Sequence, residues 1–354
     1  LSVQTTVKTK ERPMNQSNTI SIDLAKNVFQ VCVVSPDRKV ISNKPLSRNK
    51  LPEFIDNQPI SIVAMEACYS SHYWARLFSK MGHDVHMIPA QHVKPFVRGN
   101  KNDRNDALAI AEASWRPNLK CVPLKSIEQQ DIQALHRIRD KLISRRTSVV
   151  NQVRGLLSEY GVIIPMGLVN FQKHIGSLID PNEPRLTARM KWQLAESKEE
   201  YDHLSRRCLS IEKELKLYIG DNTLCQRLMT LPGVGLLNAT ALYASIGNAS
   251  QFSNPRELSV WLGLTPKQYA SGEKSFNGGI TKRGNSYLRK QLIHGARSLL
   301  HRVNGKTDKL SAWIQQLVER RGKHKAAVAV ANRLARLAWI LLHRNEDYRA
   351  VPAP

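Results

Sequence analysis

Paired cysteines are missing from this 354-residue sequence, whose five cysteines are scattered with no C-x-x-C pair among them. A zinc cluster or a disulfide framework is therefore not expected, and a reducing cytoplasm is the expected compartment. No uncharged apolar run reaches 18 residues, so we expect no membrane span. The first 13 residues are polar and basic without an apolar centre, which is not the pattern of a signal peptide.

Acidic residues are scarce, since 29 Asp and Glu face 53 Lys and Arg and leave a formal net charge of +24. So basic a chain is typical of proteins that bind nucleic acid or another anionic surface. The charge is uneven, because residues 255–354 hold 19 basic and 6 acidic side chains and thus +13 of the total. We therefore expect an N-terminal chemical domain followed by a C-terminal domain that grips nucleic acid.

Four of the few acidic residues form the most informative pattern of the chain. Asp103 and Asp106 open an apolar run that predicts a helix, and their spacing puts both carboxylates on one face of its first turn. Asp23 and Glu66 each end or interrupt a short apolar, strand-like run, where solvated acids are uncommon. Carboxylates in this order and setting indicate a site for one or two Mg²⁺ ions and phosphodiester chemistry.

The N-terminal pattern predicts a mixed sheet flanked by helices. We expect strand, turn and strand over residues 19–34, a third strand from 39, a short helix at 51–55, a strand at 61–65, a helix at 73–81 and a strand at 84–89. This is an RNase H-like α/β layout. In that layout the first strand and a later, adjacent strand each present an acid at the active edge of the sheet.

Two long helices are expected in the middle of the chain, at residues 127–160 and 185–218, joined by a proline-containing loop. The second helix carries an apolar seam with the 3, 4, 3, 4, 3 spacing of a heptad repeat: Tyr201, Leu204, Cys208, Ile211, Leu215 and Tyr218. The seam fits a helical hairpin within one chain. It fits an intersubunit coiled coil equally well, and the sequence leaves both open.

Candidate phosphate contacts follow in a mainly helical C-terminal region. Residues 231–235, L-P-G-V-G, match a helix-hairpin-helix, in which the amides around Gly233 and Gly235 would meet a phosphate; a tight interhelical turn without a ligand would look the same. A Gly- and Ser-rich basic segment, expected as a loop, precedes a helix over 287–300, and a final structural helix is expected at 326–342. The basic side chains predicted to contact nucleic acid are Lys101, Arg104, Lys282, Arg283, Arg289 and Lys290.

Taken together, these pieces resemble one family in its own order along nearly all of residues 19–345. The chain is similar to the DEDD-type insertion-sequence transposases, a family that includes Piv-like DNA invertases and bridge-RNA-guided recombinases. The matching segments are I-D-L-A-K at 22–26, M-E-A at 65–67, K-N-D-R-N-D-A at 101–107, L-P-G-V-G at 231–235, G-L-T-P-K-Q-Y-A-S-G-E at 263–273 and G-I-T-K-R-G-N at 279–285.

The resemblance implies a domain plan and a set of partners. It implies a tail at 1–18, a RuvC-like catalytic domain at 19–125, a coiled-coil region at 126–222, a transposase domain at 223–345 and a tail at 346–354. It assigns the metal-binding acids to Asp23, Glu66, Asp103 and Asp106 and a nucleophilic serine to Ser271. It also implies a dimer to tetramer that binds DNA and a structured guide RNA in the bacterial cytoplasm, associated with the nucleoid.

The chemistry of strand exchange favours a covalent step. Two Mg²⁺ ions held by four carboxylates could drive hydrolysis by water, but a transposase must also rejoin strands, and a serine phosphodiester would conserve the bond energy. Ser275 competes with Ser271 for this role, because it lies in the same accessible basic segment. Two other functions stay open: a RuvC-like metal-dependent junction nuclease without a covalent intermediate, and a non-catalytic nucleic-acid-binding scaffold.

Overall fold

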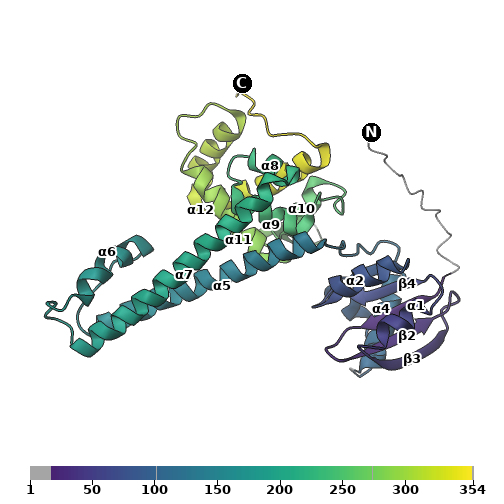
Figure 1. Ribbon diagram of the computed structural model, residues 1–354. Coiled ribbons are helices and arrows are strands. Elements are labelled where there is room, and N and C mark those ends of the chain that lie inside the picture. Colours follow the sequence, from purple (N-terminus) through teal and green to yellow (C-terminus); the bar gives the residue numbers. More distant parts are fainter. Residues whose placement is uncertain (1–16, 101, 273, 353–354) are drawn as a thin grey trace, which may run out of the picture. The chain divides into compact units, whose positions relative to one another are not determined.

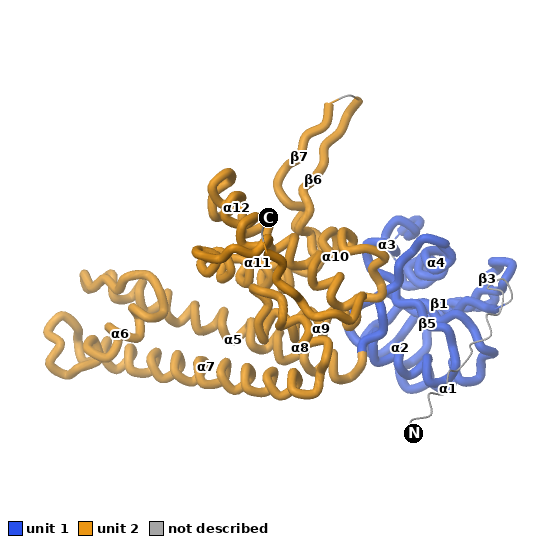
Figure 2. Tube along the Cα trace, turned by 90° about the horizontal axis from the view of Figure 1, so that it is seen from above, with its two compact units in different colours: residues 1–125 blue, residues 126–354 orange. Residues whose placement is uncertain are grey.

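The computed structural model describes residues 17–100, 102–272 and 274–352. The chain divides into two compact units, residues 1–125 and 126–354, shown in blue and orange in Figure 2. Unit 1 is an α/β domain, and unit 2 is almost entirely helical (Figure 1). Each unit has its own hydrophobic core, so each is described by itself.

Unit 1 is built on one five-stranded mixed sheet with the strand order β3-β2-β1-β4-β5. Strands β1, β2 and β3 pair antiparallel, whereas β1, β4 and β5 pair parallel. This arrangement agrees with an RNase H-like domain. The strands are β1 (Thr19–Asp23), β2 (Val28–Val34), β3 (Val40–Ser47), β4 (Ile62–Glu66) and β5 (Asp84–Ile88).

Helices cover both faces of this sheet. Because side chains alternate along a strand, Phe29, Val31 and Val33 of β2 join the core under α1 (Leu51–Asp56) and α2 (Ser71–Lys80), with Trp74 and Phe78 at its centre. Cys32 and Val34 point the other way, against the alanines of α4 (Asp103–Ser114). The short helices α3 (Ala90–Val93) and η2 (Lys94–Phe96) lead into α4. The small side chains of α4 let it lie close to the strands, so its first turn reaches the edge where β1 and β4 end.

Unit 2 begins with two long helices, α5 (Ile127–Ser158) and α7 (Ala188–Gly220), which pack side by side (Figure 1). They run antiparallel: Arg139 donates to Glu212 at 2.6 Å, while Arg145, further along α5, reaches Glu200 at 3.4 Å, further back along α7. Five of the six seam residues are buried in a core shared with α5, and Tyr218 is partly buried beside them. The seam is thus filled within the chain, which supports the helical-hairpin interpretation.

The segment between these helices was expected to be a plain loop, and that expectation was wrong. It contains α6 (Leu168–Ile179), whose Phe171, Ile175 and Leu178 are spaced as one helical face and buried in the same core. The prolines at 165, 181 and 184 all fall outside the helix, so they bound it rather than interrupt it.

The C-terminal core of unit 2 packs five helices: α8 (Thr223–Met229), α9 (Leu236–Ile246), α10 (Pro255–Trp261), α11 (Ser286–Leu300) and α12 (Lys309–Arg344). The final helix is longer than predicted and is interrupted at Gly322, where φ is 73°. Among the described helices α12 alone is long and apolar enough to cross a membrane, by length and composition only. Its residues from Ala326 to Leu342 supply a large part of this core, and 56% of its apolar window is buried.

A buried histidine joins the long helices to this core. His136 of α5 contacts the Thr240 hydroxyl through Nε2 at 2.9 Å and the Tyr287 hydroxyl through Nδ1 at 2.8 Å. The Thr240 hydroxyl already donates its proton to the Leu236 carbonyl, so it can only accept from His136. Nε2 therefore carries the proton, Nδ1 accepts from Tyr287, and the ring is neutral.

A β-hairpin stands where a flexible loop was expected, so this prediction was also wrong. Strands β6 (Pro266–Ser271) and β7 (Lys274–Ile280) pair antiparallel and project from the rest of unit 2 (Figure 2). All their residues are exposed except Ile280, which is half-buried at the base. A ladder without a hydrophobic face gives no alternating pattern, and this is why the sequence did not reveal it.

Candidate active site and nucleic-acid interface

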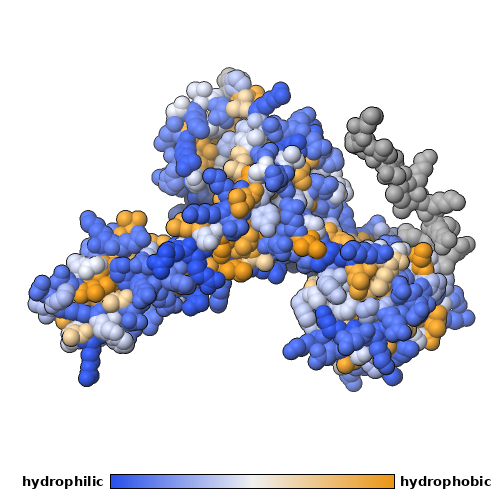
Figure 3. All heavy atoms as spheres, in the orientation of Figure 1, coloured by the Kyte–Doolittle hydropathy of each residue, from blue (hydrophilic) through white to orange (hydrophobic). Residues whose placement is uncertain are grey.

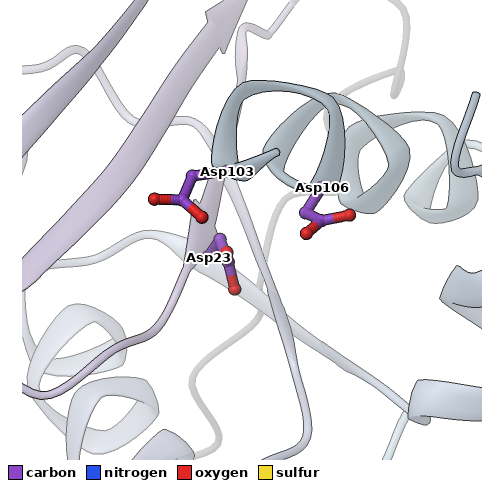
Figure 4. Close-up of side chains that lie close together, drawn as sticks. All are labelled: Asp23, Asp103 and Asp106. Atoms are coloured by element: carbon purple, nitrogen blue, oxygen red, sulfur yellow. The ribbon is translucent and has the colours of Figure 1, made fainter. Parts of the chain in front are cut away.

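Three carboxylates of unit 1 converge at the edge of the sheet. Asp23 ends β1, and Asp103 and Asp106 stand in the first turn of α4. One carboxylate oxygen of each lies within 4.8 Å of the others, and Figure 4 shows the three side chains facing a common space. Asp23 and Asp106 are half-buried and Asp103 is exposed, so the cluster is open to solvent on one side.

Several hydrogen bonds hold α4 in this position against the mutual repulsion of the carboxylates. The Ser21 hydroxyl, two residues before Asp23, donates to the Ala107 carbonyl at 2.6 Å, directly after Asp106. At the other end of the helix, the Trp115 indole donates to the Thr19 hydroxyl at 3.0 Å. The first turn itself is capped by Asn102, whose side chain accepts from the Asn105 amide at 2.8 Å.

The fourth predicted acid, Glu66, is close to this cluster but is not one of the three convergent groups. It ends β4, and the pairing of Ile22 with Met65 in neighbouring parallel strands puts Glu66 at the same sheet edge as Asp23. Burial raises the pKa of the Glu66 carboxyl, and the negative charge of Asp106 raises it further. The Glu66 carboxyl is thus partly shielded from water and lies close enough to Asp106 for the two charges to repel each other.

Cys68 also adjoins the site, which the sequence did not predict. Burial raises the pKa of its thiol to about 11, and the charges of Glu66 and Asp23 contribute to that rise. A thiol with so high a pKa is neutral near pH 7, so it adds no charge to the cluster and is a poor metal ligand. Its position two residues after Glu66 was the available signal.

The acidic cluster fits a hard divalent cation. Carboxylate oxygens are the ligands that Mg²⁺ and Mn²⁺ prefer, and with Mg²⁺–O bonds of roughly 2.1 Å adjacent ligands are about 3.0 Å apart and opposite ligands about 4.2 Å apart. The three oxygens lie within 4.8 Å of one another, so side-chain rotations that draw them together would let all three reach one ion. The N-terminus of α4 carries a partial positive charge that stabilises Asp103 and Asp106 in its first turn.

The predicted nucleophile lies in the other unit. Ser271 ends β6 and is exposed, and its ladder partner across the hairpin is Lys274. The competing Ser275 is exposed on β7 and pairs with Ala270.

The predicted basic contacts divide into exposed side chains and side chains with partners inside the chain. Lys282 and Arg283 are exposed in the turn that follows β7, and Arg104 is exposed beside Asp103. In contrast, the Arg289 guanidinium donates to the carbonyls of Leu262 (2.8 Å) and Arg283 (3.1 Å), and the Lys290 ammonium pairs with Asp140 of α5. Arg289 and Lys290 thus have intramolecular partners that the sequence did not reveal. Lys101 lies outside the described residues.

The helix-hairpin-helix segment forms a tight turn between α8 and α9. Gly233 has a φ of +86°, and a Cβ there would lie 3.1 Å from the Gly295 carbonyl of α11, so glycine is needed for both conformation and space. Gly235 is the N-cap of α9 and leaves the first amides of that helix without a side-chain cap. The turn lines an open cavity of about 550 Å³, together with His294 and Arg302.

A larger cavity at the base of the β-hairpin was not predicted. It measures about 1290 Å³ and is lined by hairpin residues 277–280 and by α12. Its basic side chains include Arg321, Lys325 and Arg336, and the Arg333 guanidinium lies 4.4 Å over the Trp313 ring. The sequence indicated a purely structural final helix, with Arg333 and Arg336 on its polar side.

Comparison with known proteins supports the resemblance on both units. A family model described as "Transposase", for DEDD transposases of the IS110 type, matches residues 20–162. A second, described as "Transposase IS116/IS110/IS902 family", matches residues 225–312. The first match contains the four predicted site acids of unit 1, and the second contains the hairpin with Ser271.

Whole-chain relatives agree. The chain is 43% identical over 342 residues to "Transposase for insertion sequence element IS1111A" of Coxiella burnetii, covering 97% of this chain and 94% of the relative. It is 42% identical to "Probable family 20 transposase" of Pseudomonas aeruginosa, covering 95% and 99%. The "Pilin gene-inverting protein" of Moraxella bovis is a distant relative, 22% identical over 93% of this chain and 97% of its own length. The chain therefore belongs to the IS110/IS116 family of DEDD transposases, enzymes that cut and transfer DNA.

Proposed function

We propose that this transposase cuts and rejoins DNA with a metal-bound acidic site and a covalent serine intermediate. The observation that carries the proposal is the convergence of Asp23, Asp103 and Asp106 at the sheet edge of a chain that belongs to a DNA-transferring family. Glu66 belongs to the same site, because its carboxyl is half-buried and feels the charge of Asp106.

In this proposal the four acids hold one or two Mg²⁺ ions. When bound, the ions supply Lewis-acid stabilisation of charge on the reacting phosphate. The protein's own contribution is to hold the carboxylates convergent. The hydrogen bond from Ser21 to Ala107 and the dipole of α4 do this before any cation arrives.

Ser271 is the proposed nucleophile. Its Oγ attacks the scissile phosphorus, forming a serine phosphodiester while the bond from phosphorus to the leaving deoxyribose oxygen breaks; the serine proton is released and the leaving oxygen takes up a proton. A deoxyribose hydroxyl of the exchanged strand then attacks the same phosphorus and restores the serine. The number of phosphodiester bonds is conserved, so rejoining needs no external energy source. The exposure of Ser271 supports its access to a duplex.

DNA and a structured guide RNA are the proposed nucleic-acid partners. The support is the +13 charge of residues 255–354, the exposed Lys282 and Arg283, and the basic lining of the large cavity. Arg289 and Lys290, which have partners within the chain, are assigned a weaker role in binding.

Self-association is proposed at the end of the helical pair that carries α6 rather than along the filled seam. Three large apolar side chains are highly exposed there: Ile163, Met166 and Val169. Figure 3 shows hydrophobic side chains gathered at that end on the visible face. Exposed apolar groups that share one region are typical of protein interfaces.

The decisive experiment is covalent trapping on a nicked suicide substrate carrying the ends of the element. Wild type and Ser275→Ala should form a protein–DNA adduct, and Ser271→Ala should form none while binding DNA normally. An adduct with Ser271→Ala but not with Ser275→Ala would assign the chemistry to Ser275. Cleavage without any adduct in wild type would favour a resolvase-like nuclease.

A further inference from the structure

The two faces of the β6–β7 hairpin differ in chemistry. Side chains alternate along paired strands, so the cross-strand pairs Tyr269–Phe276 and Ser271–Lys274 project from one face. The pairs Gln268–Asn277 and Ala270–Ser275 project from the other. One face therefore carries aromatic rings, a cation and the proposed nucleophile, whereas the opposite face has only small or neutral polar groups.

The two rings form an ordered and exposed pair. Tyr269 and Phe276 stack with centroids 4.9 Å apart and planes inclined by 17°. Tyr269 is 48% exposed and Phe276 is 65% exposed, on a hairpin that has no core of its own. Burial in this chain therefore does not explain why two large aromatic side chains stand here.

Gly278 makes room for this arrangement. A Cβ at that position would lie 3.1 Å from the Cε2 atom of the Tyr269 ring and 3.8 Å from the Cβ of Lys267. The Tyr269 ring thus rests over the bare backbone of β7, and Lys267 lies on the same face. The backbone of Gly278 is not in the left-handed region, so the space for the ring is the local reason for glycine.

We propose that this face, defined by Lys267, Tyr269, Ser271, Lys274 and Phe276, binds an unpaired nucleotide and stacks its base on the Tyr269–Phe276 rings beside Ser271. Aromatic rings with neighbouring cations are the usual platform for single-stranded nucleic acid, because every base has a π-face and every nucleotide a phosphate. Residues 266–280 contain two lysines and one acidic residue, Glu273, so their net charge is +1, which favours a nucleic acid over a basic protein surface. This nucleotide site adds a DNA-positioning role to the proposed function, and that role rests on Ser271 being the nucleophile.

The geometry gives the two serines different surroundings. Ser271 lies two residues after Tyr269 on the same strand and face, at a spacing of roughly 7 Å along the strand. This is comparable to the separation of successive phosphates in an extended strand, so a base on the rings would bring an adjacent phosphate to the Ser271 hydroxyl. Ser275 points to the opposite face, which has neither rings nor cations among its described residues.

The test uses the full-length chain and two 12-residue oligomers of equal charge, oligo(dT) and its abasic analogue. Wild type should bind oligo(dT) more tightly than the abasic oligomer. Tyr269→Ala/Phe276→Ala should lose this preference, by about 5- to 150-fold for one stacked base, and bind the abasic oligomer as before. Trp192→Ala is the matched control, since it removes a ring that is 63% exposed elsewhere on unit 2 and should keep the preference.

A second measurement does not depend on affinity. Oligo(dT) with one 5-iodouracil should cross-link on irradiation to the peptide that contains Tyr269 or Phe276, and the ring-conserving Tyr269→Phe variant should retain the cross-link. Equal binding of the two oligomers by wild type, or cross-links only elsewhere, would overturn the inference. So would a change of oligomeric state in the double variant with its base preference intact, which would make this face a protein interface.

Failure of the inference is distinguishable from failure of the proposed function. If Ser271 forms the DNA adduct but the rings show no base preference, the nucleotide site is wrong and the covalent mechanism stands. If the rings bind a base but no adduct forms at Ser271, the hairpin binds single strands and the assignment of Ser271 as the nucleophile is wrong.

Discussion

The carboxylates of unit 1 and the serine of unit 2 are supported in opposite ways. Asp23 ends a strand of a sheet that is covered on both faces, and Asp103 and Asp106 stand on the helix packed against one of those faces and tied to the sheet by the hydrogen bond from Ser21 to Ala107. Ser271 stands on a hairpin that is exposed almost throughout. Like charges must be forced together, which requires a rigid frame. A hydroxyl that must approach a bulky substrate must instead be exposed and project from the protein. Unit 1 therefore provides a rigid site, whereas unit 2 provides an accessible one.

The largest effect should come from breaking the rigid part of unit 2. Leu204 is 1% exposed in the helical pair, so Leu204→Asp removes apolar contacts and buries a carboxylate. We expect a loss of at least about 5 kcal/mol in the free energy of unfolding of unit 2. Hydrogen exchange should show lost protection in α5 and α7, while the sheet of unit 1 keeps its protection.

Leu209 provides the control on the same helix. It is 59% exposed, so Leu209→Asp should change stability by no more than about 0.5 kcal/mol. A fully protected, monomeric Leu204→Asp protein would show that the seam serves an intersubunit contact after all.

The next effect separates chemistry from stability in unit 1. Asp106→Asn should reduce strand transfer more than about 100-fold, because the loss of a metal ligand exceeds the 10- to 100-fold effect of losing an outer-shell partner. The fold should be retained, and without divalent cations the melting temperature should rise, since the substitution relieves repulsion in the cluster.

A plasmid recombination assay and thermal denaturation measure these two outcomes. Asp56→Asn, which neutralises an exposed acid on α1 in the same unit, should alter neither. If Asp106→Asn lowers the melting temperature together with the activity, the carboxylate has a structural role instead.

A smaller effect should appear as a pH dependence confined to unit 2. Burial, together with the smaller effect of the Arg139 charge, lowers the pKa of His136 from 6.5 to about 4. Between these values the unfolded chain binds a proton that the folded chain does not, so stability decreases as pH falls from about 6.5 to about 4. The full difference is roughly 3 kcal/mol.

Urea unfolding at pH 6.5 and pH 4.5 tests this dependence. His136→Gln should flatten it, because the substituted side chain does not titrate. An equally steep decrease in the variant would assign the pH dependence to other groups.

The sequence predicted the elements whose residues alternate between core and solvent. The strands of unit 1, α4 and the two long helices all followed from apolar spacing, and Asp23 and Glu66 stood out because each ends a buried strand. The hairpin was missed because it has no buried face, and α6 was missed because prolines on both sides concealed a short apolar helix. The partners of Arg289 and Lys290 lie 6 to 150 positions away along the chain, so the spacing of residues in the sequence cannot reveal them.

The filled seam gives the helical pair a mechanical property. With 33 residues at 1.5 Å per residue, α7 is about 50 Å long. Two helices packed along one face resist bending far more than one helix does, so the pair acts as a rigid spacer of nearly constant length. A partner bound at the α6 end is therefore held at a fixed distance from the C-terminal core. Inserting one heptad into each helix would lengthen the pair by about 10 Å and preserve its facing surfaces, whereas two extra residues would turn each helix by about 200° and point its seam away from its partner.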